Sequence, residues 1–464
     1  MMNSVKNIFN IPDLRRRVFY TFALLAVYRI GGHVPVPGIN FEALDAFFKQ
    51  QAGSLLGFLD LFSGGNLRRL TIFALGIMPY ISASIILQLL TVIWPYLEKL
   101  SKEGGEAGRR KITQWTRYGT VVLSVIQSYG ISLWLENFAT SGGPQVVVHP
   151  GIGFEFMTIL TLTTGTAFIM WLGEQISERG IGNGISLIIF AGIVVNPPHA
   201  VLATVEDLMT GNIGMITLVL LLVIMVLVVA AIVFVERAQR RIPVQYARRV
   251  VGRRTYGGLS THLPLRLNTG GVIPVIFASS ILSIFQTLGQ IPWVQRTPWA
   301  RDLIHQFDFS MPLHHMLYFL FIIFFCYFYV SIIFNPMDTA DNLQKFGGFI
   351  PGIRPGRRTA EYIDNVLTRL TFVGSIYLAL IALLPTILIS GFNVGAIPGI
   401  GPGLEYILPD FLSKGLNVKF VFGGTSLLIV VGVAMDTVQQ VESQLIMRHY
   451  EGFLKGARIK GRRG

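Results

Sequence analysis

Long apolar runs, separated by short polar segments, make up most of the chain. Ten of these runs are long enough to form helices that cross the roughly 30 Å hydrocarbon core of a bilayer. They lie near residues 18–34, 75–97, 118–135, 154–173, 185–201, 213–235, 270–288, 313–334, 370–389 and 420–441. The fifth run is the weakest, because its apolar part is short and Asn196, Pro197 and Pro198 interrupt it. We therefore predict ten transmembrane helices, with both ends of the chain on the same side of the membrane.

The stretch 58–97 combines two different patterns. Its second part, 75–97, can span a membrane but contains an unusual number of polar side chains, Ser82, Ser84, Gln88 and Thr91. Such side chains are costly in hydrocarbon, so this helix should face protein or water. The first part carries Asp60, two glycines and two arginines, so it cannot span. The pattern suggests a pore wall preceded by a stopper hinged at Gly64 and Gly65. A simple connecting loop, followed by serines that make ordinary helix–helix contacts, is the alternative.

Composition and charge place the chain in a membrane and orient it. Of 464 residues, 52% are hydrophobic and 14% are charged, against about 25% charged in soluble domains. With ten spans, 30 of the 38 Lys and Arg residues fall on the side of the N-terminus, so both ends should be cytoplasmic. Two cytoplasmic segments, 236–268 and 335–369, are long and basic. They suit an acidic or phosphate-rich partner. The alternative is that they only reflect the general excess of Lys and Arg in the cytoplasmic loops of membrane proteins.

The sequence lacks the residues that several classes of function require. The single cysteine, Cys326, excludes an intrachain disulfide, and no spacing typical of metal ligands, nucleotide-binding loops or catalytic serines occurs. We predict no catalytic residue, no metal and no cofactor, which leaves a membrane-embedded enzyme without support. The main rival is a small-solute secondary transporter. An ion-coupled transporter generally needs ionisable groups at the membrane midplane, and the predicted spans provide none there.

Isoleucines occupy the middle of four of the predicted spans. They are Ile81 and Ile85, Ile189 and Ile193, Ile276, and Ile429. A ring of such side chains around a central hole would form a dry constriction that stops ions by dewetting and can still yield. Isoleucine is common in membrane helices, so the spacing alone does not establish a ring.

From about Asn10 to Lys455 the chain resembles the SecY family, the central channel subunits of the bacterial protein translocase. The resemblance rests on long strings such as IFALGIMPYISASIILQLL (72–90), MWLGEQISERGIGNGISLIIFAGIV (170–194) and NPMDTADNLQKFGGFIPGIRPG (335–356). It implies an all-α membrane protein with ten transmembrane helices. They would form two inverted five-helix halves, about 1–205 and 206–464, as a clamshell around an hourglass pore with a short plug helix.

The same resemblance implies a passive protein-conducting channel in the bacterial inner membrane. Such a channel passes unfolded secretory polypeptides and releases signal sequences and transmembrane segments sideways into lipid. The implied partners are the SecE and SecG subunits, the SecA motor ATPase and the ribosome with its rRNA. Two features depart from the family pattern: the external loop 390–419 is longer, and Gly104–Gly105 carries an extra glycine.

Individual residues take their implied roles from this resemblance. The six isoleucines match the pore ring, and about 61–71 matches the plug, with Leu61, Phe62, Ser63, Gly64, Gly65, Asn66, Leu67, Arg68 and Arg69. The second and third spans would face the seventh and eighth at a lateral gate, with candidate polar residues Ser84, Gln88, Asn268 and Ser279. The arginines expected to engage the motor or the ribosome are Arg237, Arg240, Arg241, Arg253, Arg254 and Arg354.

Overall fold

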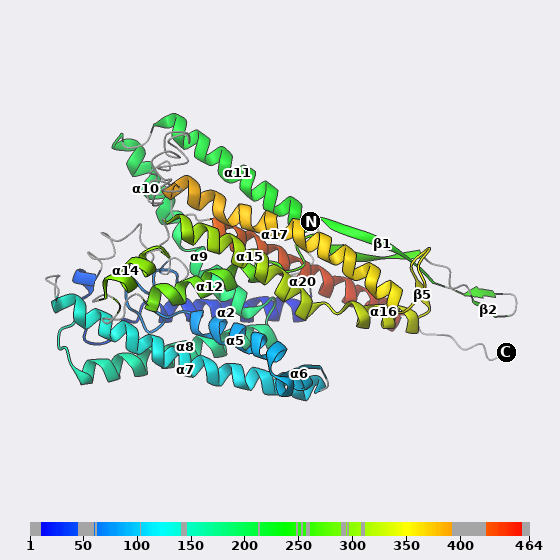
Figure 1. Cartoon of the computed structure of the whole chain (residues 1–464), viewed down its shortest axis with the longest axis horizontal. Coiled ribbons are helices and arrows are strands. Elements are labelled where there is room, and N and C mark those ends of the chain that lie inside the picture. The colour runs from blue at the N-terminus through cyan, green and yellow to red at the C-terminus, as the bar shows by residue number, and fades with distance from the viewer. Residues whose placement is uncertain are drawn as a thin grey trace. The chain divides into compact units, whose positions relative to one another are not determined.

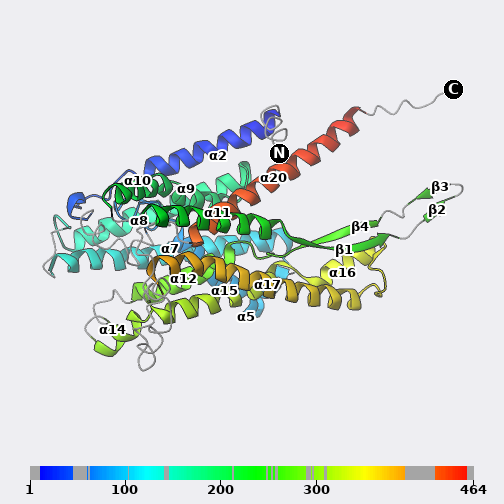
Figure 2. The same cartoon turned by 90° about the horizontal axis from the view of Figure 1, so that it is seen from above.

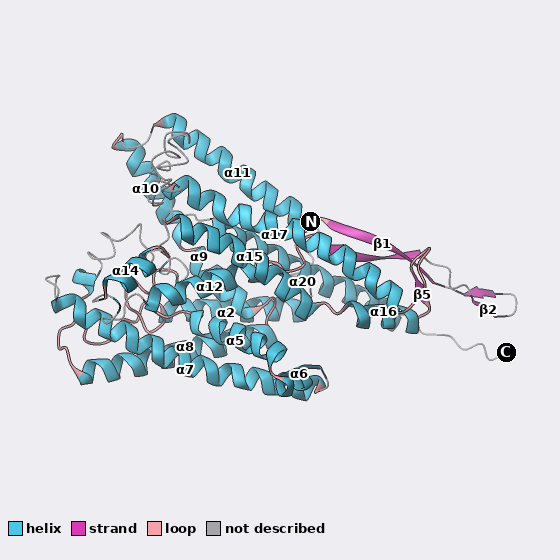
Figure 3. Cartoon of the chain, in the orientation of Figure 1, coloured by secondary structure: helices cyan, strands magenta, loops and turns pink. Residues whose placement is uncertain are grey.

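The fold is mostly helical (Figures 1 and 3). The computed structural model describes residues 11–44, 60, 63–102, 104–140, 146–211, 214–246, 249–251, 254–256, 260–288, 294, 297–307, 311–391 and 424–456. The chain separates into two compact units. One consists of Met1–Leu202, Thr287–Pro298 and Val433–Gly464, and the other of Ala203–Gln286 and Trp299–Gly432. An inverted symmetry between two halves that divide near residue 205 stays a prediction.

Fourteen helices and five strands are named within the described residues. The helices before residue 210 are α2 (Pro12–Gly31), α5 (Met78–Ile93), α6 (Pro95–Lys102), α7 (Gly105–Thr140), α8 (Ile152–Arg179), α9 (Gly184–Ile193) and α10 (Asn196–Met209). The later helices are α11 (Met215–Arg237), α12 (Ile273–Leu288), α14 (Pro298–His305), α15 (Pro312–Ile333), α16 (Pro336–Lys345), α17 (Arg357–Ser390) and α20 (Gly424–Gly456). The strands are β1 (Gln239–Tyr246), β2 (Arg249–Val251), β3 (Arg254–Tyr256), β4 (Ser260–Arg266) and β5 (Gly348–Phe349).

A helix lies at each of the ten intervals predicted to span. Within the described residues, five stretches are long and apolar enough to cross a membrane: Gly105–Glu136, Ile152–Arg179, Leu218–Arg237, Pro312–Lys345 and Arg357–Leu384. The pair α5 and α6 would add a sixth span, and two shorter apolar helices lie at Gly184–Ile193 and Ile273–Leu282. Several crossings are therefore established, while the count of ten stays a prediction.

Two predicted spans are broken rather than continuous. The prediction of one helix over 75–97 was wrong, because α5 ends at Ile93 and α6 turns away from it by 102°. Pro95 explains the break, since it has no N–H to donate and disfavours a helical residue before it. The fifth predicted span divides in the same way, into α9 and α10, next to Pro197 and Pro198.

The close packing of α7 rests on a stripe of small hydroxyl side chains. They recur every fourth residue and are buried, as Thr116, Thr120, Ser124, Ser128 and Ser132. Each hydroxyl donates a hydrogen bond to a carbonyl of its own helix. The stripe therefore buries no unsatisfied donor and lets neighbouring backbones approach closely. Helix α7 packs against α5 and α8.

The basic segment 236–268 contains strands, which corrects the all-α prediction. Strand β1 pairs antiparallel with β4, from Gln239 opposite Arg266 to Gln245 opposite Ser260. It also pairs with β5 of the second basic segment, which gives a sheet in the order β4-β1-β5. The hairpin continues from the end of α11, with β2 and β3 toward its tip (Figure 2). The two basic segments are therefore joined by backbone hydrogen bonds.

Candidate functional site

All six isoleucines of the predicted ring are buried. The exposed fraction is 6% for Ile81 and 2% for Ile85 on α5, whereas the adjacent Ile86 is 42% exposed. The other four have exposed fractions of 6% or less: Ile189, Ile193, Ile276 and Ile429. Four of the six belong to the first unit and two to the second. That the six meet at one constriction stays a prediction.

The predicted plug lies directly against α9. A Cβ added to Gly64 would lie 2.8 Å from both the Cα and the carbonyl oxygen of Gly192. Gly192 immediately precedes Ile193, one of the isoleucines predicted to form the ring, so the predicted plug contacts the backbone of α9. Gly64 and Gly65 have φ of +73° and +83°, which only glycine adopts readily, as the predicted hinge requires.

The plug turn is held by a buried set of polar groups. The Asn66 side-chain amide donates to the carbonyl oxygen of Ser63 at 2.6 Å and to the Tyr28 hydroxyl at 3.4 Å. The Tyr28 hydroxyl in turn donates to the same Ser63 carbonyl at 3.4 Å. Asn66 is 2% exposed, so these bonds are made away from water. They tie the plug to helix α2.

Asp60 closes the plug turn from its other end. One carboxylate oxygen accepts the backbone N–H of Arg68 at 2.8 Å and the Ser63 hydroxyl at 3.2 Å. The Asp60 carbonyl oxygen accepts the backbone N–H of Gly65 at 3.0 Å. Burial raises the pKa of the Asp60 carboxyl, and the hydrogen bonds from Arg68 and Ser63 oppose this shift. Asp60 is thus hydrogen-bonded to Ser63, Gly65 and Arg68.

The second half of the predicted plug is part of the hydrophobic core. Leu67 and Leu70 are buried in a cluster that also contains residues of the segment after α2 and of α7 and α8. The Val36 N–H donates to the Leu70 carbonyl oxygen at 2.9 Å, and the Ile72 N–H donates to that of Val34 at 2.9 Å. Asp60 and Ser63 are helical, and residues 64–77 form turns, a bend and an isolated bridge from Thr71 to Pro35 instead of continuing as a helix. The predicted residues Leu61 and Phe62 lie outside the described residues.

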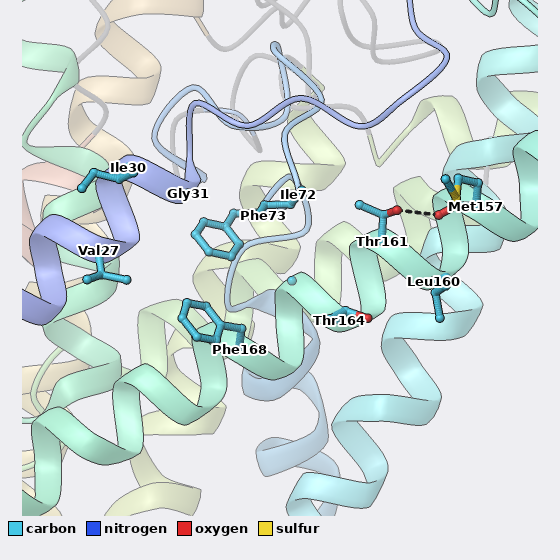
Figure 4. A pocket seen from close by; sticks show the side chains of 11 residues that line it. Val27, Ile30, Gly31, Ile72, Phe73, Met157, Leu160, Thr161, Thr164 and Phe168 are labelled. Carbon is cyan, nitrogen blue, oxygen red and sulfur yellow. Dashed lines mark hydrogen bonds between the residues drawn. The ribbon is translucent and has the colours of Figure 1, made fainter.

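An aromatic stack anchors the chain where it leaves the plug. Phe73 stacks on Tyr28, with ring centroids 5.7 Å apart, and on Phe168 of α8, with centroids 6.1 Å apart. Phe73 and Phe168 border an apolar groove of about 690 Å³ between α2 and α8, which Val27, Ile30 and Leu160 also line (Figure 4). The exit from the plug is therefore fixed to α2 and α8.

Three of the four candidate gate residues, Ser84, Gln88 and Ser279, make hydrogen bonds within their own helix. Gln88 donates to the Ser84 hydroxyl at 3.1 Å, and the Gln88 side-chain oxygen is buried with no hydrogen-bond partner in the described part of the chain. The Ser279 hydroxyl bonds to the Ile276 carbonyl of its own helix at 2.9 Å. Asn268 donates to Glu236 at 2.6 Å. Ser84 and Gln88 therefore fit a polar patch on α5, whereas Asn268 belongs to the root of the hairpin β1–β4.

Three of the predicted docking arginines, Arg240, Arg241 and Arg354, lie on a packed structure, and Arg237 lies beside it at the end of α11. We call the docking platform the set formed by β1, β4, β5, α16 and residues 350–366. Its core contains Ile242, Leu265, Ile350, Ile363 and Val366. Arg237, Arg240, Arg241 and Arg354 are exposed, and the turn that carries Arg354 is closed by the Thr359 hydroxyl, which donates to the Arg354 carbonyl oxygen at 2.9 Å. The cations are displayed by a packed structure.

Other predicted features lie partly or wholly outside the described residues. Arg253 lies outside them, and Arg254 is described as part of the backbone of β3. Residues 392–423, with most of the long loop 390–419, also lie outside. At the glycine pair, Gly104 faces the Leu100 carbonyl oxygen, and Gly105, with φ of +53°, is the first residue of α7.

Comparison with known proteins gives the family. The SecY family model matches residues 71–438. The protein translocase subunit SecY of Escherichia coli (strain K12) is 48% identical over 456 residues, which cover 97% of this chain and 96% of the relative. The chain belongs to the SecY family. The corresponding subunit of Aquifex aeolicus (strain VF5) is 45% identical, with 98% of this chain and all of that subunit covered. The resemblance seen in the sequence is confirmed, and the chain is a multi-pass membrane protein.

Solved structures of similar fold agree with the membership in the SecY family. A protein-conducting channel matches with a TM-score of 0.62 at 18% identity, covering 96% of this chain and 95% of the other. A second structure concerns the SecY plug domain, which stabilises the closed state of the translocation channel and maintains a membrane seal. It matches with a TM-score of 0.61 at 19% identity and the same coverage. The canine Sec61 in a ribosome–channel complex matches with a TM-score of 0.58 at 17% identity, over 96% and 95% of the two chains.

Sequence reasoning missed four residues that organise these sites. Tyr28 and Gly192 contact the predicted plug, Asp60 closes its turn, and Glu236 lies buried at the root of the platform. Asp60 and Glu236 carried a visible signal, because each is an acid in an otherwise basic or apolar segment. Tyr28 and Gly192 lie inside apolar runs, and nothing in the sequence marks them. Their roles depend on contacts with residues 63–66, which are distant from them in the sequence.

Proposed function

We propose that the chain is the channel subunit of a bacterial protein translocase, a passive pore for unfolded secretory polypeptides. The observation that carries this proposal is the seat of the plug, where Gly64 lies on Gly192 next to the ring isoleucine Ile193. A stopper that fits a helix of the constriction has no role in an enzyme. In this proposal the ten helices form two inverted halves, and the six isoleucines close the waist of an hourglass pore.

The chemistry of the seal suits a pore that must open for a polypeptide. Aliphatic side chains exclude ions because water leaves a narrow apolar constriction, and no ionic or covalent bond has to break when it opens. The plug adds a second layer held by a few hydrogen bonds around Ser63, Asn66 and Tyr28. Since Leu67 and Leu70 stay in the core, the part that moves ends near Asn66. Opening therefore needs a local rearrangement.

Sideways release of a polypeptide segment would follow from its partitioning between the aqueous pore and the lipid. A segment between α5 and α12 would be offered to lipid at the proposed lateral gate, with Ser84, Gln88 and Ser279 as its polar contacts. Each Å² of apolar surface removed from water favours the lipid by about 25 cal/mol, so an apolar segment leaves and a polar segment continues outward. Asn268 is not included in this proposal, because its amide is bonded to Glu236.

The energy source and the partners are also part of the proposal. The exposed arginines of the platform suit the acidic or phosphate-rich surfaces of the SecA motor and of ribosomal RNA. SecE would clamp the two halves and SecG would lie at the periphery. The chain would reside in the bacterial inner membrane with both termini cytoplasmic, as the distribution of Lys and Arg indicates.

Arg354→Glu tests the docking role of the platform. We expect complexes with SecE and SecG to assemble normally, and SecA-driven translocation of a secretory precursor into vesicles to fall about tenfold or more, since reversing a charge opposes the partner's field. Arg301→Glu is the matched control, because Arg301 is an exposed arginine predicted to lie on the external side. Normal translocation by Arg354→Glu would remove the docking role. Failure of the unmodified complex to translocate, with saturable uptake of a small solute instead, would favour the transporter.

A further inference from the structure

A buried polar pair joins the docking platform to the helix that carries Ile276. Glu236 is the penultimate residue of α11, and Asn268 follows β4, so the two flank the root of the hairpin. The Asn268 amide nitrogen donates to the Glu236 carboxylate at 2.6 Å and to the Gly271 carbonyl oxygen at 3.2 Å. One amide group therefore bridges the end of α11 and the chain that leads into α12.

The surroundings of this pair leave little room for movement within the root. Glu236 and Asn268 are 8% and 5% exposed. The Leu267 N–H donates to the Ala238 carbonyl oxygen at 2.9 Å, which closes the base of the hairpin. On the other side, a Cβ added to Gly374 of α17 would lie 2.6 Å from the Leu267 carbonyl oxygen. A hydrogen bond to a charged group in such a site is stronger and more directional than one in water.

The link from the pair to α12 is short and tightly folded. Gly271, whose carbonyl oxygen accepts from Asn268, has φ of +61°, and α12 begins two residues later at Ile273. Ile276 lies in the first turn of that helix. Because the Asn268 amide fixes the backbone at Gly271, it also sets the direction in which α12 starts.

We propose that Glu236 and Asn268 are positioning residues that transmit docking on the platform to α12 and so to Ile276. The proposal rests on the proposed function, in which a partner docks on the platform and Ile276 belongs to the constriction. A displacement of the hairpin root moves Asn268, and the bonded Gly271 carbonyl carries that displacement into α12. Without the bridging amide, the partner still binds but its effect on α12 is weakened.

Asn268→Leu tests this coupling in the full complex with SecE and SecG. The side chain keeps a similar size but loses both donors. We expect the dissociation constant for SecA to stay within about twofold, and the translocation rate at saturating SecA to fall about tenfold, as loss of a buried bond to a charged group implies. Thr269→Val is the matched control, because it removes the neighbouring bond to the Arg266 carbonyl at a half-buried position of the same root.

Two further variants separate coupling from folding. Glu236→Gln keeps an oxygen that accepts from Asn268, so translocation should stay within about twofold of the unmodified complex. In a Cys326→Ser background, SecA should change the rate of thiol modification of Ile276→Cys, and Asn268→Leu should abolish that change without altering the rate measured before SecA is added. Equal responses with and without Asn268→Leu would overturn the coupling. Failure of the unmodified complex to translocate would instead overturn the proposed function.

Discussion

Gly64→Ala should unseat the plug and raise the resting ion conductance of the reconstituted channel by about tenfold or more. The added Cβ would lie 2.8 Å from the Cα and carbonyl oxygen of Gly192, atoms of a helix backbone that cannot rotate away. Overfilling a packed site costs about 1–3 kcal/mol, in addition to the roughly 1–2 kcal/mol that a non-glycine residue incurs in the left-handed region. Single-channel recording in planar bilayers measures the effect.

Gly65→Ala provides the matched control for this experiment. Gly65 has a similar backbone conformation, with φ of +83°, but a Cβ added there would meet nothing within 4 Å. Both variants therefore carry the backbone strain, and Gly64→Ala alone carries the clash with α9. We expect a much smaller rise in conductance for Gly65→Ala. Equal conductance in the two variants would show that strain, and not the seat on Gly192, explains the result.

Ile85→Asn is the second substitution with a large expected effect. Ile85 is 2% exposed, and an amide at that position would need hydrogen-bond partners, for which water is the available source. A constriction that attracts water conducts ions, so we expect the resting conductance to rise roughly tenfold and defective signal sequences to be accepted. Conductance and the translocation of a precursor with a damaged signal sequence are the two readouts.

Ile85→Leu is the control, because it keeps an apolar side chain of equal volume. Its conductance should stay within about twofold of the unmodified channel, as volume-conserving apolar exchanges are well tolerated. If Ile85→Asn neither leaks nor relaxes the requirement for a good signal sequence, Ile85 has no place in the seal.

The apolar parts of the helices could be predicted from the sequence, and their polar continuations could not. The prediction 118–135 marks the middle of α7, which extends from Gly105 to Thr140, and α17 begins thirteen residues before its predicted span. A search for apolar runs detects the part of a helix that lies in hydrocarbon. The polar ends continue as helix because backbone hydrogen bonds persist into water, so they leave no hydropathy signal.

The strands of the platform illustrate a second limit. Ile242 and Val244 alternate with exposed residues along β1, a period of two that was visible in the sequence. The arginines and Pro243 around them favoured a loop, and the pairing with β5 depends on a contact across about a hundred residues. In the structure, Ile242 is buried in the same hydrophobic cluster as Ile363, a tertiary contact that the sequence alone does not indicate.

In the candidate site too, local features could be predicted from the sequence and contacts between distant residues could not. The glycine hinge of the plug follows from local chemistry, because two adjacent glycines permit backbone angles that other residues avoid. The partner of Gly64 could not be predicted, since Gly192 lies in an apolar run with no mark of its role. Asn268 shows a similar limit, because its bond to Glu236 joins residues 32 positions apart and had no mark in the sequence, while its place at the gate stays a prediction.

Thiol cross-linking across the predicted ring tests the central claim most directly. In a Cys326→Ser background, the complex would carry Ile85→Cys together with Ile429→Cys, and a short bis-maleimide would be added to the resting channel. The account predicts efficient cross-linking of this pair, and none when Ile86→Cys, on the exposed side of α5, replaces Ile85→Cys. Failure of the first pair to react, or equal reaction of both pairs, would show that the isoleucines do not meet at one constriction.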